Sequence, residues 1–125
     1  MPAADRQPGV LCLLGAEAPM RGLLAQLRGL GMHVDTAQGG ADARTTFFAA
    51  GGCDCLVIAP DVRPGVAKAV LQALRCLDPE LALASFCSSP DPGHRSLQVS
   101  LASYHPSSRA GTGALLRFLR TLRLR

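Results

Sequence analysis

Three short apolar runs, set apart by stretches with helical spacing, constrain the fold of this chain more than any other feature. They cover residues 10–14, 55–59 and 81–86, and each is nearly continuous. A run of this length without polar alternation is typical of a strand buried on both faces, as in a parallel sheet. Because helical patterns lie between the runs, the chain predicts a parallel sheet with helices on both faces.

Four helices are expected from apolar residues that recur every three or four positions. The second lies within residues 41–50, the third begins at Pro64, and Ser107 or Ser108 caps the last. The residues expected to be buried are Met20, Leu23, Leu24, Leu27 and Leu30 in the first helix, Phe47 and Phe48 in the second, Val66, Val70, Leu71, Leu74 and Leu77 in the third, and Leu115, Leu116, Phe118, Leu119 and Leu122 in the last.

Two more strands complete the alternation, at residues 33–36 and 99–104. Right-handed crossovers then favour a doubly wound, flavodoxin-like sheet of five parallel strands in the order 2-1-3-4-5. A length of 125 residues is typical of a single domain. We place this domain at residues 9–125, after a flexible tail of residues 1–8.

Composition excludes several other classes of protein. With 48% hydrophobic and 18% charged residues, the chain is globular rather than disordered, and no apolar run approaches the ~18 residues of a membrane span. An apolar run at residues 9–16 does end near Ala16-Glu17-Ala18, which has the small-x-small pattern of a signal-peptidase site. Asp5 weakens the basic region that a signal peptide needs, and cleavage would remove the first strand. A cytoplasmic location is therefore favoured.

The cysteines predict neither a disulfide framework nor a metal site. Their number, five, is odd, and their spacing matches no zinc motif. Cys53 and Cys55 share one face of a strand without a histidine nearby. We expect cysteines that fill the core as small apolar residues in a reducing compartment, with Cys76 exposed off the apolar stripe of its helix.

The segment at residues 53–61, CDCLVIAPD, resembles the central strand of response-regulator receiver (CheY-like) domains, usually Y-D-L-V-L-L-D-x-x-x-P. Pro64-Gly65 fits the P-G turn of that family, and Pro79-Glu80-Leu81 fits the segment before its fourth strand. The resemblance covers residues 9–125. It implies the same CheY-like fold, with a shortened or irregular fourth helix, because only seventeen residues separate Cys87 from His105.

The same alignment implies a phosphorylation pocket whose reactive residues are replaced. Receivers carry two acids after strand one that bind Mg²⁺, an aspartate after strand three that accepts the phosphoryl group, a Thr or Ser after strand four, and a Lys followed by a cis proline after strand five. The corresponding residues here are Gly15, Ala16 and the acid that follows them, Glu17; Ala59; Cys87; and His105 and Pro106. Phosphoryl transfer needs a nucleophile, a cation and donors together, so the alignment predicts a domain without catalysis and without a metal or other cofactor.

Four residues near this pocket carry side chains with potential chemistry. Asp61 stands two residues past the acceptor position and is either a displaced nucleophile or, as we favour, a turn residue after Pro60. Glu17 alone is a weak magnesium site, because Mg²⁺ prefers several oxygen ligands. His105 is either a switch group or, as we favour, a polar cap at the mouth of the pocket. Cys87 is not followed by the CX5R loop of cysteine phosphatases.

Charge is concentrated at the carboxyl-terminal end of the chain. All nine acidic residues lie within residues 1–91, whereas residues 92–125 contain six arginines. In receivers, the fourth helix, fifth strand and last helix form a face for dimerisation and output, so the resemblance places a candidate interaction face here. Its candidate residues are Tyr104, Arg109, Arg117, Arg120 and Arg123. The alternative is an arginine surface that is only solvated.

These observations favour a pseudo-receiver, a non-catalytic module of a bacterial signalling or transcription regulator that acts through protein contacts without phosphorylation. We expect a protein partner or an attached output domain, with a homodimer as a further possibility, and no membrane contact. Direct binding of nucleic acid is not expected, since no basic patch is interleaved with aromatic residues. The alternative is a small-ligand-binding or enzymatic domain that uses the crevice near Gly15, Ala59 and Cys87.

Overall fold

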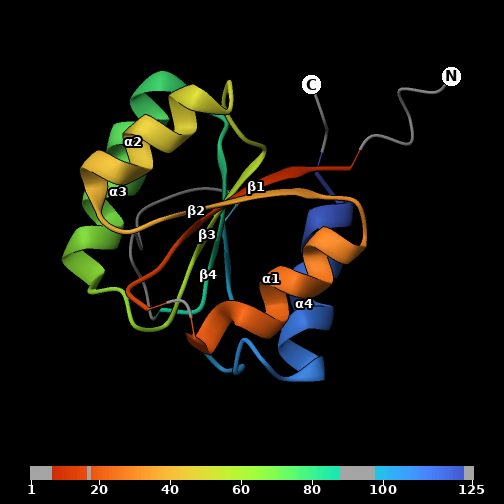
Figure 1. Ribbon diagram of the computed structural model, residues 1–125. Helices are drawn as coiled ribbons and strands as arrows, with labels where there is room; N and C mark the ends of the chain where they lie inside the picture. Colours follow the sequence, from red (N-terminus) through yellow and green to blue (C-terminus); the bar gives the residue numbers. More distant parts are fainter. Residues whose placement is uncertain (1–6, 17, 88–97, 123–125) are drawn as a thin grey trace, which may run out of the picture.

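Five parallel strands form one sheet in the order β2-β1-β3-β4-β5, as the sequence predicts for a doubly wound, flavodoxin-like domain. The computed structural model describes residues 7–16, 18–87 and 98–122 (Figure 1). The strands are β1 (Gly9–Leu13), β2 (His33–Ala37), β3 (Cys55–Ile58), β4 (Ala82–Ser85) and β5 (Gln98–Ser100). The fold class is therefore confirmed.

The strand register brings the carboxyl ends of the central strands level with one another. Leu13 of β1 lies opposite Ala37 of β2 and Ile58 of β3. Ile58 in turn pairs with Ser85 of β4, which pairs with Ser100 of β5. The loops that follow these strands consequently begin at one edge of the sheet, where doubly wound domains place their functional crevice.

The helices cover both faces of the sheet. They are α1 (Arg21–Gly29), preceded by the 3-10 turn η2 (Ala18–Met20), α2 (Gly40–Ala49), α3 (Pro64–Leu77) and α4 (Arg109–Arg120). Helices α2 and α3 lie on one face, and α1 and α4 lie on the other (Figure 1). The expected shortened fourth helix of the family falls largely within residues 88–97, outside the described residues.

The core consists of the sheet and the inner stripe of each helix. Every residue of β3 and β4 is buried, and so are the central leucines of α1, α3 and α4. Cys12 and Cys55 lie in this core as small fillers, while Cys76 is exposed, as expected. All five cysteines are free thiols. No helix within the described ranges is long and apolar enough to cross a membrane.

Four residues expected in the helix stripes are instead exposed. Leu30 is 47% exposed, Phe48 64%, Val66 39% and Leu77 48%. Each lies in the first or last turn of its helix or just beyond it. The fifth strand is also shorter than the expected 99–104, because a turn follows it in which the Tyr104 N–H donates to the Leu101 carbonyl at 2.9 Å.

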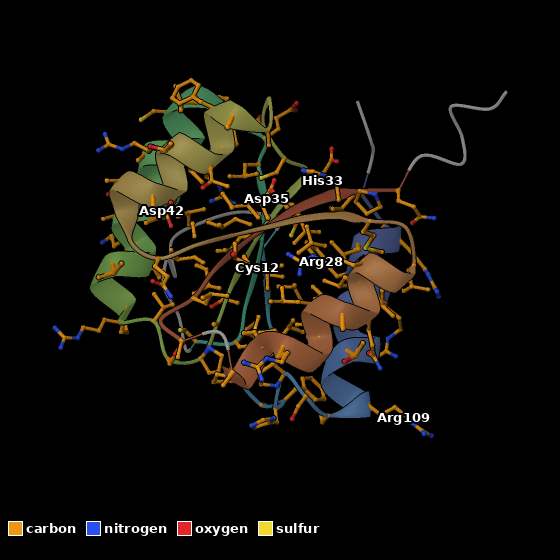
Figure 2. All side chains as sticks on the ribbon, viewed as in Figure 1. Cys12, Arg28, His33, Asp35, Asp42 and Arg109 are labelled. Carbon is orange, nitrogen blue, oxygen red and sulfur yellow. The ribbon has the colours of Figure 1, made fainter. Side chains whose placement is uncertain are left out.

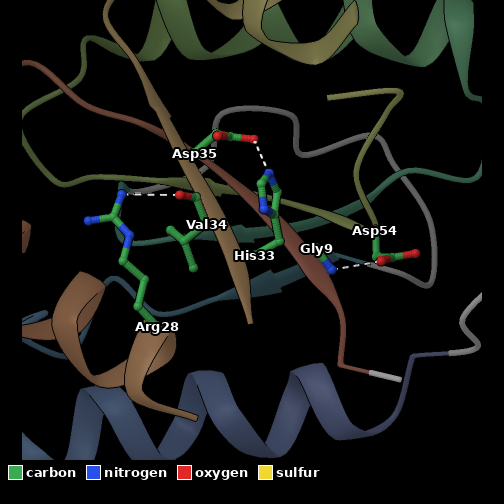
Figure 3. Close-up of polar contacts among 6 residues, drawn as sticks. All are labelled: Gly9, Arg28, His33, Val34, Asp35 and Asp54. Atoms are coloured by element: carbon green, nitrogen blue, oxygen red, sulfur yellow. Dashed lines mark hydrogen bonds and ion pairs between the residues drawn. The ribbon is translucent and has the colours of Figure 1, made fainter. Parts of the chain in front are cut away.

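Polar contacts fix the opposite, amino-terminal edge of the sheet (Figure 3). The Asp54 carboxylate accepts the Gly9 N–H at 2.7 Å and so joins the starts of β1 and β3. On β2, the Arg28 guanidinium donates to the Val34 carbonyl at 3.1 Å, and the His33 ring contacts the Asp35 carboxylate at 2.9 Å. The first two contacts involve backbone groups of β1 and β2, so they help to hold the register that aligns the other edge.

Candidate functional site

The candidate site lies at the carboxyl edge of the sheet, in the loops that follow β1, β3 and β4. Gly15 and Ala16 come two and three residues after β1, Ala59 directly follows β3, and Cys87 follows β4. The paired strands place these loops side by side, as the sequence predicts. Glu17 was also expected here, but it lies outside the described residues.

Ala59 occupies the predicted acceptor position as part of the packed sheet. Its residue is fully buried, and its N–H donates to the Leu13 carbonyl at 2.9 Å, so it continues the ladder between β1 and β3. A methyl group has no lone pair with which to attack phosphorus or bind a metal ion. The residue at this position therefore supplies packing and no chemistry.

The Asp61 side chain crosses to the loop after β1. Its carboxylate accepts the Gly15 N–H at 3.1 Å and the Ala16 N–H at 2.8 Å, an arrangement that we call the Asp61 clamp. A Cβ atom at Gly15 would lie 2.8 Å from the Asp61 Oδ2 atom, closer than real Cβ contacts allow. A side chain at position 15 would therefore displace the Asp61 carboxylate and weaken the clamp, and this is one of the two positions where the family carries a metal-binding acid.

Gln38 supports the same loop from β2. Its side-chain amide donates to the Gly15 carbonyl at 3.1 Å, so both peptide groups that flank Gly15 have partners. The Gln38 N–H in turn donates to the Asp42 carboxylate at 2.8 Å, which fixes the start of α2. The sequence does not predict this contact of Gln38, since a single polar residue after an edge strand carries no distinctive signal.

The clamp adds a structural role for Asp61 to the turn position expected from the sequence. It does lie in a turn, as favoured, but its two carboxylate oxygens each accept a backbone N–H from a neighbouring loop. Such charge-assisted bonds stabilise the carboxylate where it stands. The side chain thus acts as a bridge between the loops after β1 and β3.

Cys87, at the position of the family's Thr or Ser, also makes contacts within the fold. Its thiol lies 2.9 Å from the Ala59 carbonyl oxygen and 3.1 Å from that of Val62. Burial raises the pKa of the Cys87 thiol, and the Asp61 carboxylate raises it further, against a lowering by the Val62 hydrogen bond. A protonated thiol that donates to carbonyl groups is a poor nucleophile.

Ser85 fixes the backbone that carries Cys87. Its hydroxyl donates to the Cys87 carbonyl and accepts the Cys87 N–H, both at 3.0 Å. Ser85 is 1% exposed, and this reciprocal pair satisfies its hydroxyl within the core.

A cavity of about 370 Å³ adjoins this turn. It is lined by Pro60, Val62, Pro64, Phe86, Cys87 and Ala102.

His105 and Pro106 begin the turn before α4. The His105 Nδ1 atom accepts the Ser107 N–H at 3.2 Å, and the His105 carbonyl accepts from the Ser108 hydroxyl at 2.7 Å. The contacts described for His105 thus stay within its own turn and do not reach Asp61 or Cys87. The family's cis proline is not reproduced: the bond before Pro106 is trans, and the described residues contain no cis peptide bond.

The donor set at this edge does not fit a hard cation. Gly15 and Ala16 offer no side-chain oxygen, and the nearby Asp61 carboxylate is engaged by their N–H groups. No group of three or more His, Cys, Asp or Glu side chains that could bind a metal ion occurs among the described residues. The usual receiver site for Mg²⁺ is therefore not reproduced by the residues that the structure describes.

The arginine face is built on α4. Leu115 and Leu119 are buried, while Arg109, Arg117 and Arg120 are exposed on the other side of the helix. Figure 2 shows Arg109 pointing away from the body of the protein. Tyr104, just before the helix, is 39% exposed, and Arg123 lies outside the described residues. Within the described ranges, none of the exposed arginines of α4 forms an ion pair.

Comparisons with known proteins place the fold. No protein-family model matches the chain, and no curated protein matches it by sequence. Several solved structures match the chain. One is chemotaxis response regulator CheY4 of Vibrio cholerae, which is 14% identical with a TM-score of 0.64. The match covers 91% of this chain and 99% of CheY4. A two-component transcriptional regulator AraC from Clostridium phytofermentans is 17% identical with a TM-score of 0.66, covering 90% and 92%.

A third match is response regulator TrrA in complex with the histidine kinase ThkA, at 16% identity and a TM-score of 0.58, covering 89% of this chain and 97% of the matched chain. Together with the strand order, these matches establish a CheY-like receiver fold. At such identities the likeness extends to the fold alone. What the site does must be argued from its own residues.

Proposed function

We propose that the chain is a pseudo-receiver: a non-catalytic signalling module with a receiver fold that acts through protein contacts without being phosphorylated. The observation that carries this proposal is the pairing of Ala59 with the Asp61 clamp. The acceptor position has no nucleophile, and the carboxylate nearest to it bonds to the backbone of the loop after β1. Phosphoryl transfer uses a metal ion, a nucleophile and cationic donors together, and the described residues at this edge do not supply that set.

The test is exposure of the purified chain to acetyl phosphate and Mg²⁺, followed by intact mass measurement. We expect no adduct, whereas a typical receiver domain treated in parallel gains one phosphoryl group. An acid-labile adduct on this chain would overturn the proposal. The variant Asp61→Asn then identifies the residue: loss of the adduct in this variant would make Asp61 a displaced nucleophile.

The arginine face of α4 supports contact with an acidic protein surface, in a partner or in an attached output domain. Its exposed guanidinium groups have no acidic neighbours in the described part of residues 98–122. Exposed charges are screened over about 8–10 Å at physiological ionic strength, so such a contact should weaken as salt is added. Without phosphorylation to gate it, the contact would depend on how much of each partner is present.

The cavity beside Cys87 supports a second candidate, a site for a small ligand. Its volume of about 370 Å³ lies at the lower end of ligand pockets, and it occupies the carboxyl edge where such folds bind ligands. Native mass spectrometry of the purified chain would reveal a co-purified molecule. Ala102 is exposed at the rim, so Ala102→Trp should displace a true ligand while leaving the fold intact. A chain that carries no added mass would count against this candidate.

A further inference from the structure

A groove runs along the amino-terminal edge of the sheet, at the opposite end from the candidate site. One part, of about 690 Å³, lies between the ends of α2 and α3 and is lined by Phe47, Phe48, Gly51, Gly52, Leu77, Asp78, Pro79 and Glu80. A second part, of about 450 Å³, shares Gly51, Gly52 and Asp78 with the first and continues past Asp54 and His33. The shared residues join the two parts into one groove.

The floor of the first part exposes two large apolar side chains. Phe48 is the most exposed large hydrophobic residue in the described part of the chain, at 64%, and Leu77 is 48% exposed. Phe48 stands edge-on to the buried Phe47, with ring centroids 6.2 Å apart, so its position is defined by packing. Neighbouring exposed apolar residues with a polar rim are typical of an interaction surface.

The rim of the first part carries two acidic residues, Asp78 and the exposed Glu80. The Glu80 N–H donates to the Asp78 carboxylate at 3.2 Å, which keeps both residues in one turn at the end of α3. Asp54 lies farther along the same groove. An occupant that suits this surface therefore combines apolar side chains with positive charge.

The outer side of α4 has that combination. Arg117 and Arg120 are exposed on it, and the apolar residues Leu116 and Phe118 are only partly buried beside them. In one molecule this surface cannot reach the groove, since α4 covers one face of the sheet while α2 and α3 cover the other (Figure 1). The two complementary surfaces can meet only between two copies.

We propose that the groove of one copy receives the α4 arginine face of a second copy, so that the chain associates head to tail. The inference uses the arginine face of the proposed function and assigns it a partner. A two-fold dimer through the groove alone or through α4 alone would bring like charges together, acid on acid or arginine on arginine. A reciprocal two-fold dimer would need the groove and α4 on one side of the molecule, whereas α4 lies on the opposite face of the sheet from α2 and α3, whose ends form the groove (Figure 1). The head-to-tail contact pairs opposite charges instead, and such heterologous contacts build open assemblies rather than closed dimers.

Sedimentation velocity of the full chain tests this contact. We expect the weight-average sedimentation coefficient to rise with protein concentration and to fall toward the monomer value as salt is added. The variants Phe48→Ser, Glu80→Arg and Arg117→Glu/Arg120→Glu should each reduce the association constant by about tenfold or more, because each removes one side of the contact. All four positions are exposed, and circular dichroism confirms folding before comparison.

Two matched controls come from elsewhere on the surface. Leu30→Ser removes an apolar side chain of similar exposure at the end of α1, and Lys68→Glu reverses a charge on an exposed residue near the start of α3. Neither position lines the groove or lies on α4, so both variants should associate like the parent chain. A loss as large as that of Phe48→Ser in either control would overturn the assignment of the groove.

Mixing gives the sharpest test. The Glu80→Arg chain and the Arg117→Glu/Arg120→Glu chain should each be monomeric alone, yet associate when combined, because the groove of one and the helix of the other regain opposite charges. A mixture that remains monomeric, or a parent chain that is monomeric at every concentration, would overturn the proposal. Neither result bears on phosphorylation. The pseudo-receiver proposal is tested separately, by the acetyl phosphate experiment.

Discussion

Gly15 and Asp61 form a coupled pair at the residue scale, because a side chain at position 15 would displace the Asp61 carboxylate. Each of the two Asp61 hydrogen bonds crosses between loops that are more than forty residues apart in the sequence. Mutating either partner alone therefore changes the environment of the other. A double-mutant cycle measures such a coupling directly.

We predict that Gly15→Ala lowers the free energy of unfolding by about 0.5–1 kcal/mol, since its Cβ would displace the exposed Asp61 carboxylate and cost up to the two hydrogen bonds of the clamp. Asp61→Ala alone should cost about 0.5–1 kcal/mol, because water can replace an exposed acceptor. In the double variant the cost of Gly15→Ala should largely vanish. Urea unfolding measures all three, and Gly22→Ala, with no atom within 4 Å of its Cβ, serves as the control. Strictly additive costs would contradict the clamp.

Ala59→Asp provides a second test at this scale. Restoring the acceptor should not restore phosphorylation, because the metal-binding acids and the cationic group remain absent. The new carboxylate would be fully buried beside the Asp61 turn, so we expect a loss of about 2 kcal/mol or more in unfolding free energy. Ala102→Asp, on the exposed loop before α4, is the control and should be neutral. Efficient labelling of Ala59→Asp by acetyl phosphate would show a more complete site.

At the scale of elements, the cap of α4 distinguishes two adjacent serines. The Ser108 hydroxyl accepts the Gly111 N–H at 2.9 Å, whereas the Ser107 hydroxyl contacts the His105 ring. We predict that Ser108→Ala lowers the unfolding free energy by about 1 kcal/mol. Ser107→Ala, one residue earlier, should have a clearly smaller effect in the same thermal or urea unfolding experiment. Equal losses would mean that the cap is not specific to position 108.

The elements also show which features the sequence predicts and why others escape it. Continuous apolar runs such as residues 55–59 identify buried strands, and their alternation with helices sets the sheet order. Helical spacing says less about the first and last turns, since a leucine at a helix end continues the pattern whether or not the sheet extends beneath it. Leu30 and Leu77 were therefore expected to be buried, and that expectation was wrong.

The site shows the same division. The positions of Ala59 and Cys87 follow from the ends of strands, so the sequence predicts them well. The direction of the Asp61 side chain and the carbonyl partners of Cys87 depend on loop backbones, for which spacing carries no information. Likewise, Gln38 and Ser85 act by hydrogen bonding to backbone groups. Polar residues are common at strand ends, so the sequence alone does not single out these two.

At the scale of the whole molecule, buried thiols make stability depend on pH. Burial raises the pKa of Cys12 and of Cys53 from 9.0 to about 12. Above pH 9 the unfolded chain releases these protons while the folded chain retains them, so unfolding becomes more favourable as pH rises from 9 toward 12. Each thiol contributes up to about 1.4 kcal/mol per pH unit in that window.

We expect urea unfolding under reducing conditions to show this loss between about pH 8 and pH 10.5. Cys12→Ala should make the decline with pH shallower, because one of the retained protons is gone. Gly22→Ala, which removes no thiol and has no atom within 4 Å of its Cβ, is the control and should leave the slope unchanged. Identical slopes for the parent and Cys12→Ala would show that this thiol titrates alike in the folded and unfolded chains.

The Asp61 clamp has one more consequence for the molecule as a whole. A phosphate or metal ion that bridged these loops would dissociate on dilution and could be removed by a chelator or a competing anion. The Asp61 carboxylate belongs to the same chain as the Gly15 and Ala16 N–H donors, so it meets them at a high effective concentration that does not depend on any free ligand. The link between the loops after β1 and β3 therefore lasts as long as the fold itself.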